Sequence, residues 1–280
     1  MKTKLSILLL LASVLTLNAQ APFPNRDEIN QFMASKTCVV LDGNQFSTYN
    51  LFIRRAVEAY WTITPYEFIN VDEFDRRQSD PAYSFITLTQ TSFDRDKSNT
   101  VYNFLNLLQG KNVRRIGEMP EICAIPLSVV DDDDEDDYSY KLGAILFFMQ
   151  EHTKMISENP SLTGRRYLRY YNINTPKVKQ KTVLVKEEDL SPAISAIGNI
   201  RAIYPHRIEI VSEEAIIKAI AEKTPNTLIL HKVGTNKISA FCFKMLIGVD
   251  DSDMYYYHQH RITRSAPDGL LPADLRRMRK

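Results

Sequence analysis

Residues 66–74 read YEFINVDEF and residues 208–216 read IEIVSEEAI, and the two stretches carry one pattern. Each opens with strand-forming residues and reaches a residue suited to a helix N-cap, Asn70 or Ser212, whose side-chain oxygen accepts a bond from a free backbone N–H. Two acidic residues follow each cap, where the helix dipole favours negative charge. The pattern predicts a strand followed by a helix in both places, at an offset of 142 residues.

The repeat extends to both sides of this pair. Before it, Val39-Val40-Leu41 and Val183-Leu184-Val185 are short apolar strands at an offset of 144, each followed by apolar residues at helical spacing. After it, each helix stops near a proline, Pro81 or Pro225, and three strand-like runs and a closing helix follow. The predicted fold class is therefore α/β with mixed sheets, built as two similar tandem β-α-β-α-β-β-β-α units that arose by internal duplication.

Connection lengths predict the topology of each unit. The first three strands are joined by helices, so they should be parallel neighbours through right-handed crossovers, and the last strands should form an antiparallel meander. The predicted boundaries are a signal peptide over 1–19, an N-terminal segment over 20–35, a first unit over 36–158, a linker over 159–180 and a second unit over 181–280.

The first residues have the order of a secretory signal peptide. Lys2 and Lys4 precede an apolar run from Leu5 to Leu17, and the small residue Ala19 stands before the expected cleavage point. The run is shorter than the roughly 20 residues of a membrane span, which favours cleavage over an uncleaved anchor. We therefore expect a periplasmic or secreted protein with no transmembrane span in its mature chain. The mature chain keeps 33 basic and 34 acidic side chains, a balance that argues against nucleic acid as a partner.

Cys38, Cys123 and Cys242 each lie inside an apolar, strand-like run. An exported protein can form disulfides, so one bridge and one free thiol are an alternative. Three buried thiols are favoured, because core strands are where unpaired cysteines pack. No disulfide is expected between Cys38 and Cys242.

Asp42 is a candidate binding residue in the turn Asp42-Gly43-Asn44, directly after the first predicted strand. Ligands often bind at this position in α/β sheets. The counterpart in the second unit is Lys186-Glu187-Glu188, which lacks the glycine. An Asp-Gly turn that serves chain geometry alone is the favoured interpretation.

His258 and His260 are the best candidates for metal binding. Alternate residues of a strand point the same way, so both imidazoles could reach one ion. No third ligand is evident, and an ordinary strand surface explains the pair equally well.

Aromatic and basic residues supply the remaining candidates. The single tryptophan, Trp61, could anchor a ligand, although core packing at a helix end is favoured. In the linker, Arg165, Arg166 and Tyr170 belong to a basic, tyrosine-rich patch. The acidic run Asp131–Asp137 lacks the spacing and the glycine of a calcium loop, which favours a solvated loop.

These observations favour a binding function over catalysis. No nucleophile elbow, phosphate loop or dinucleotide-binding glycine pattern is present, so no cofactor is expected. We predict an exported, non-enzymatic binding or scaffold protein of the periplasm or cell envelope, with a protein partner there. The alternative is a hydrolase or metal-dependent enzyme that uses Asp42 with His258 and His260.

The stretch from Ala56 to Phe74, AVEAYWTITPYEFINVDEF, with a signal ending in Asn-Ala-Gln, resembles secreted proteins of the Bacteroidetes type to which no function is assigned. The C-terminal part from Tyr255 to Leu275 has the same look. The element order is also similar to that of small α/β domains in periplasmic parts of outer-membrane assemblies, such as the curli-secretion lipoprotein. This chain lacks the lipidated cysteine of that group, and the resemblance carries no catalytic motif across.

Overall fold

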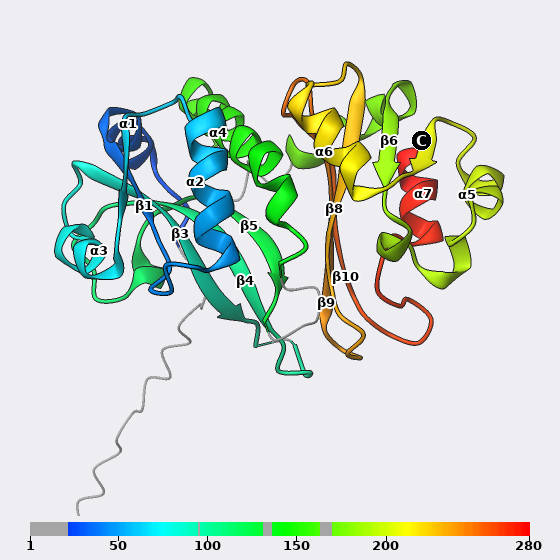
Figure 1. Ribbon diagram of the computed structural model, residues 1–280, viewed down its shortest axis with the longest axis horizontal. Coiled ribbons are helices and arrows are strands. Elements are labelled where there is room, and N and C mark those ends of the chain that lie inside the picture. Colours follow the sequence, from blue (N-terminus) through cyan, green and yellow to red (C-terminus); the bar gives the residue numbers. More distant parts are fainter. Residues whose placement is uncertain (1–21, 95, 131–135, 163–169) are drawn as a thin grey trace, which may run out of the picture.

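The computed structural model describes residues 22–94, 96–130, 136–162 and 170–280, which form two units side by side (Figure 1). The first unit comprises α1 (Arg26–Ala34), β1 (Lys36–Val40), α2 (Thr48–Tyr60), β2 (Tyr66–Ile69), α3 (Val71–Arg77), β3 (Tyr83–Ser92), β4 (Val101–Gln109), β5 (Glu121–Val129) and α4 (Leu142–Glu158). The second unit comprises β6 (Thr182–Val185), α5 (Ile197–Ile203), β7 (Ile208–Ile210), α6 (Glu213–Ala221), β8 (Thr227–Val233), β9 (Phe241–Gly248), β10 (Met254–Arg261) and α7 (Pro272–Met278). Short 3-10 turns precede α4 (η2, Ser139–Lys141) and β6 (η5, Thr175–Gln180) and follow β6 (η6, Glu187–Asp189).

The two sheets have the same strand order, as the tandem prediction requires. The first runs β2-β1-β3-β4-β5 and the second runs β7-β6-β8-β9-β10. In each sheet the first three strands of the chain are parallel and the last three are antiparallel. The predicted mixed α/β fold with two similar units is confirmed.

Strand pairing refines the offset between the units. Thr37 of β1 pairs with Tyr66, and Val183 of β6 pairs with Ile208. An offset of 142 for the second strand thus corresponds to 146 for the first, where the sequence pattern predicted 144. The difference is two residues, so every side chain keeps the predicted face of its sheet.

Helices cover both faces of each sheet. In the first unit α1, α2 and α4 pack on one face, while α3 packs on the other through Phe74. In the second unit η5, α5 and α7 take the place of α1, α2 and α4, and α6 takes the place of α3. Phe74 and Ile216 both lie in the core, as their shared position in the repeat predicts.

Helix starts agree with the sequence pattern at Asn70 and differ at two other positions. The Asn70 side chain accepts the N–H of Glu73 at 2.9 Å. Ser212 is the N-cap of α6, but its hydroxyl bonds the Glu214 carboxylate and lowers the pKa of that group. The N-terminal segment, for which no helix was predicted, contains α1, which begins with a capping box formed by Asn25 and Glu28.

The two units share one continuous hydrophobic core. The face of the second sheet that carries α6 packs against α4, β4 and β5 of the first unit, which lie beside β8 and β9 in Figure 1. Phe243 of β9 lies with its ring centroid 5.5 Å from Tyr102 and 6.1 Å from Phe104. The Tyr102 hydroxyl also accepts the N–H of Phe241 at 2.7 Å, which adds a backbone bond across the junction.

All three cysteines are buried and free. This confirms three packed thiols and no bridge between Cys38 and Cys242. Burial raises the pKa of each thiol, that of Cys38 to about 11, so none is a reactive thiolate at neutral pH. In the part of the chain that the structure describes, no helix is long and apolar enough to span a bilayer.

A core substitution at the junction should destabilise both units together. Phe243 is 3 % exposed, and Phe243→Ala should cost about 3 to 5 kcal/mol in free energy of unfolding. Trp61 in the first unit reports the loss by fluorescence during urea unfolding, with far-UV circular dichroism as a second probe. The control Phe46→Ala, at a side chain that is 94 % exposed, should change stability by less than about 0.5 kcal/mol. A Trp61 transition unchanged by Phe243→Ala would show that the units unfold independently.

Candidate functional site

The carboxyl ends of β6 and β8 form the position where α/β sheets usually bind ligands. The chain leaves β6 toward β7 on one side and returns to β8 on the other, so the connections diverge between β6 and β8. Lys186 and η6 follow β6 at this point, and Lys232 lies near the end of β8.

The first unit covers this position with residues 137–141. A cavity of about 40 Å³ remains between the units, with room for roughly two or three water molecules. Its polar lining comes from both units and includes Asp137, Lys141, Asp189, His231 and Lys232.

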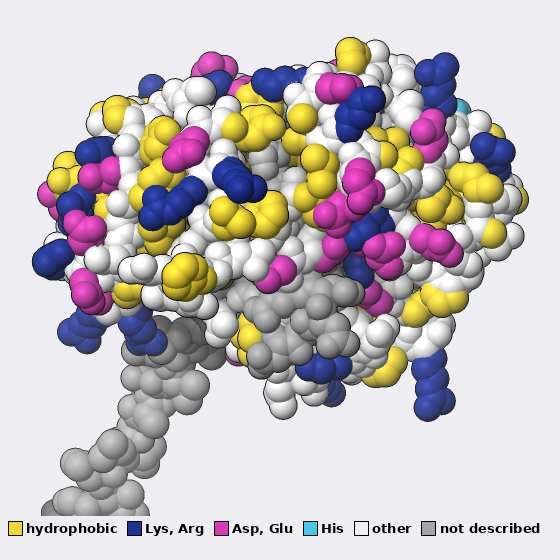
Figure 2. Space-filling model, in the orientation of Figure 1, with side chains coloured by type: hydrophobic (Ala, Val, Ile, Leu, Met, Phe, Trp, Pro, Cys, Tyr) yellow, Lys and Arg dark blue, Asp and Glu magenta, His cyan; other side chains and the backbone are white. Residues whose placement is uncertain are grey.

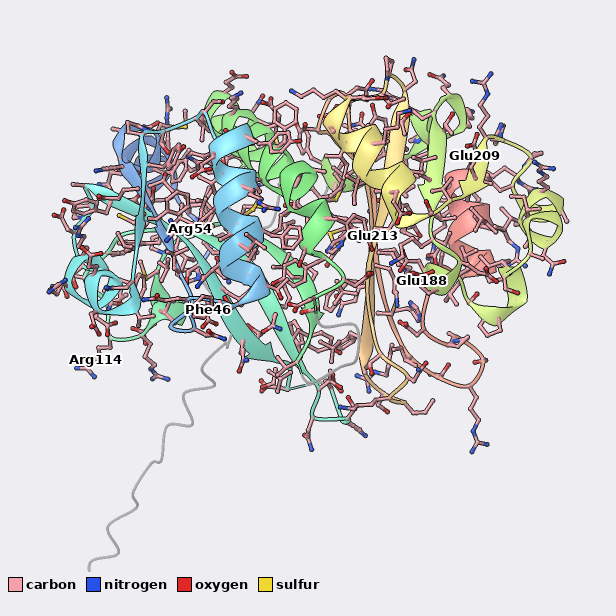
Figure 3. The ribbon with its side chains drawn as sticks, viewed as in Figure 1. Phe46, Arg54, Arg114, Glu188, Glu209 and Glu213 are labelled. Atoms are coloured by element: carbon pink, nitrogen blue, oxygen red, sulfur yellow. The ribbon has the colours of Figure 1, made fainter. Side chains whose placement is uncertain are left out.

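Lys186 joins the units at the rim of this cavity. Its ammonium lies 2.7 Å from Asp137 of the first unit, 2.6 Å from Glu188 and 3.8 Å from Glu213. Burial alone would lower the pKa of Lys186, but its hydrogen bonds to Asp137 and Glu188 raise it. Figure 2 shows the acidic side chains gathered here beside the junction, and Figure 3 shows Glu188 and Glu213 close together. The lysine is therefore a permanent cation and not a nucleophile.

Three buried groups deeper in the cavity have incomplete hydrogen bonding. Lys141 Nζ lies 3.8 Å from Asp189 Oδ2, which is an ion pair but too long for a hydrogen bond, and that oxygen has no other partner among the described residues. Burial raises the pKa of Asp189, while Lys141 opposes the shift. His231 Nε2 donates to the Pro126 carbonyl at 2.8 Å, which leaves Nδ1 as an unpaired acceptor within the described structure. Ordered water in the cavity would satisfy these atoms.

A row of charges crosses the second sheet next to this cavity. Lys232, Lys244 and His258 are cross-strand neighbours on β8, β9 and β10. The same row of the first sheet consists of Leu88, Leu105 and Ile125. The second unit therefore differs from the first by a basic row in place of an apolar one.

Two aspartates neutralise this row. Asp274, on α7, is fully buried and accepts from Lys244 at 2.5 Å, from Tyr256 at 2.6 Å and from the N–H of Leu271 at 2.8 Å. Burial alone would raise the pKa of Asp274, but hydrogen bonds from His258 and Lys244 hold it well below its usual range. Asp268 pairs with Lys232 at 2.8 Å. The row is thus internally paired, as buried charges must be.

The structure does not bring Asp42 to the two histidines. Asp42 lies at the open carboxyl end of β1, where its carboxylate caps the N–H of Asn44 and its backbone binds Asn50. His258 and His260 lie on the α7 side of the second sheet, the face turned away from the first unit. Across the described ranges, no cavity or hydrogen bond links Asp42 with either ring.

Both histidines are engaged with protein groups. His258 Nδ1 lies 3.1 Å from Asp274, and its Nε2 accepts from Arg277 at 2.9 Å. His260 Nε2 lies 2.9 Å from the Pro267 carbonyl. In the described chain, no three His, Cys, Asp or Glu side chains form a group that could hold a metal ion. The arrangement supplies no third ligand for the predicted pair.

The aromatic and basic candidates divide between core, surface and undescribed chain. Trp61 is 4 % exposed, and its indole N–H donates to Thr64 at 3.0 Å, so it packs in the core. Tyr170 is 37 % exposed and lines a second cavity. Arg165 and Arg166 lie outside the described residues, as does most of the acidic run, of which Asp137 binds Lys186.

Sequence reasoning missed the residues of the junction. Lys186 was noted only as the counterpart of Asp42, and Asp189, His231 and Lys141 carry no motif. One signal was present: Lys232 and Lys244 interrupt strands that are otherwise apolar, and a buried lysine needs a partner.

Comparison of the chain with models of protein families, with curated proteins and with solved structures gives no match.

The titration of His231 should appear in the acid stability of the protein. Burial and the Lys141 charge lower the pKa of His231 to about 3, below its ordinary 6.5. A depressed histidine pKa stabilises the fold above pH 6.5, and this contribution is lost as the pH falls toward 3. Gln at this position keeps an N–H donor for Pro126 without titrating. Between pH 6.5 and pH 4, wild type should lose about 3 kcal/mol more stability than His231→Gln in urea unfolding. Equal losses would contradict this assignment; the second buried histidine, His152, is present in both proteins and cancels.

Gly234 should be indispensable for the Lys232–Asp268 pair. A Cβ at Gly234 would lie 1.8 Å from Asp268 Oδ1 and 2.8 Å from its Cγ, so the carboxylate must move. Gly234→Ala should therefore destabilise the fold by about 3 kcal/mol, the cost of breaking a buried pair. The matched control is Gly198→Ala in α5, where nothing lies within 4 Å of the new Cβ and a gain of about 0.5 to 1 kcal/mol is expected. Thermal unfolding of both variants measures the difference, and similar midpoints would refute the steric argument.

Proposed function

We propose that this chain is an exported, non-enzymatic binding protein of the cell envelope, and that it holds a protein partner at the carboxyl edge of its first unit. The supporting observation is a difference between equivalent edges. In the second unit the edge after β6 is covered by the first unit, and Lys186 and Asp189 are buried there. In the first unit the edge after β1 is open, and residues 42–46 are all exposed.

The open edge presents apolar side chains. Phe46 is 94 % exposed and lies at the end of α2 in Figure 3. Leu51 on the first turns of α2 is 49 % exposed, and Val71 at the start of α3 is 48 % exposed. The ends of β1 and β2 are adjacent, because Leu41 N–H donates to the Ile69 carbonyl at 2.9 Å. The apolar residues that follow these strands therefore belong to one edge.

The loop that carries Phe46 is held in place before any partner binds. The Asn50 amide donates to the carbonyls of Asp42 at 3.0 Å and Asn44 at 2.8 Å, and its oxygen accepts the N–H of Asp42 at 2.8 Å. The Asn44 side chain accepts the N–H of Phe46 at 3.1 Å. An ordered aromatic side chain loses little conformational entropy on binding, which is the property of an interface anchor. Asp42 contributes to this loop as a structural turn residue.

The buried chemistry of the protein supports binding over catalysis. The three thiols are protonated, and Lys186 and Lys232 are held as cations because carboxylates raise the pKa of each against the effect of burial. The sequence pattern of an exported chain places the expected partner in the periplasm or envelope.

Substitution of Phe46 should remove the partner without changing the fold. Tagged Phe46→Ser, expressed with its own signal, should lose an envelope protein that wild type retains, whereas Ile238→Ser should keep it. Ile238 is 55 % exposed on the loop before β9 of the second unit, so it controls for a general loss of surface hydrophobicity. Co-purification from envelope fractions with mass spectrometry measures the outcome. Retention of the same proteins by both variants, or fractionation of wild type as a free cytoplasmic protein, would refute the proposal.

A further inference from the structure

A second cavity, independent of the proposed docking edge, lies between α4, residues 170–174 and the turn that leads into β10. Its volume is about 70 Å³, with room for roughly five water molecules. Phe148 and Tyr171 form a buried aromatic part of its lining, with their ring centroids 5.6 Å apart. Met155 and Tyr170 line it nearer the surface. The cavity is thus narrow and largely apolar.

One buried hydroxyl in this cavity has no partner. Ser252 is 1 % exposed and lines the cavity, and its Oγ has no hydrogen bond within the described structure. The backbone of Ser252 is fixed in the left-handed region at φ 61°, with its N–H bonded to the Gly248 carbonyl at 3.1 Å. A buried hydroxyl without a partner is unfavourable, so this site favours a ligand that can bond to it.

The carboxylate next to this hydroxyl lacks a cation. Among the described residues, no basic side chain lies within 4 Å of Asp253, and its printed contact is the Asn174 amide at 3.5 Å. Nearby lysines are committed elsewhere: Lys177 donates to Asn174 Oδ1 at 2.9 Å, and Lys181 binds Asp251 at 2.7 Å. Burial and the charge of Asp251 raise the pKa of Asp253, the effect expected of an uncompensated carboxylate.

Negative charge also comes from α4. Glu151 lines the cavity and is paired with Lys154 at 2.6 Å. A cation in the cavity would therefore meet one free carboxylate, one shared carboxylate, one hydroxyl and several aromatic rings. Each of these favours positive charge or a hydrogen-bond donor.

We propose that this cavity binds the alkylammonium group of a lysine side chain. The ammonium donates to the Asp253 carboxylate and to Ser252 Oγ, and its third N–H remains for water or a carbonyl. The four-carbon stem lies against Met155 and the aromatic rings, as lysine stems do on apolar surfaces. A butylammonium group has about as many heavy atoms as the waters that the cavity could hold.

Titration with Nα-acetyl-lysine amide tests this site. The full mature chain, labelled with ¹³C at methionine methyl groups, reports binding through Met155 and Met254 at the cavity, while Met33 in the first unit serves as an internal control. A saturable shift of the Met155 and Met254 signals is expected, with Met33 unchanged. Nα-acetyl-norleucine amide, which has a similar stem without the ammonium, should bind about tenfold or more weakly.

Matched variants separate the site from general charge effects. Asp253→Asn and Ser252→Gly should each weaken binding about tenfold, and glycine suits the positive φ of residue 252. Glu158→Gln, at an exposed carboxylate at the end of α4, should change binding less than about twofold. Unchanged Met33 signals verify that each variant is folded.

The outcomes that overturn the proposal are specific. The titration is repeated on a variant with Arg165, Arg166 and Arg169 replaced by serine, which removes competing cations of the chain itself. Absence of a saturable shift in both proteins would exclude the site. Binding of Nα-acetyl-arginine amide as tight as that of the lysine derivative would overturn the assignment to an ammonium group.

Discussion

The apolar face of β8 and β9 leaves water by packing against the first unit, and the arrangement of the molecule depends on this burial. Phe243 and Met245 supply that face from β9. Their equivalents in the first sheet are Phe104 and Asn106, and Asn106 bonds Thr89 on its own sheet. The repeated units therefore meet through unlike surfaces, because only the second sheet is apolar at this row. Hydrophobic burial of this kind gives one cooperative body.

The same contact determines the chemistry of the second unit. Docking of residues 137–141 closes the edge after β6 and removes Lys186, Asp189 and His231 from bulk water. Low-dielectric surroundings make unpaired charge costly, and each buried cation of the described network has a carboxylate near it. The result is a set of permanently charged pairs, which positions elements and orders the junction. Such pairs hold structure in place, since a cation with a raised pKa has no lone pair for nucleophilic attack.

Function in this protein follows from which edges the fold leaves accessible. The outer edge of β10 is covered by the linker, where Asn172 exchanges hydrogen bonds with both the N–H and the carbonyl of Tyr257. The carboxyl edge of the first unit stays open, and its loop is ordered by Asn50. A rigid body with one covered and one open carboxyl edge suits a scaffold, because a partner meets a surface that needs no rearrangement.

Local patterns in the sequence determined the elements and the tandem plan, because strand and helix periodicities and N-caps such as Asn70 act over a few residues. The capping box at Asn25 carried the same kind of signal for α1 and was missed. Only tertiary structure decided the junction and its site, because Lys141, Asp189 and His231 come from separate segments that meet through side-chain packing across the chain. Of the two equivalent turns, sequence favoured Asp42 as a ligand position, yet the fold buries Lys186 and leaves Asp42 in solvent. Which edge is covered depends on the docking of whole surfaces, and no single segment encodes that.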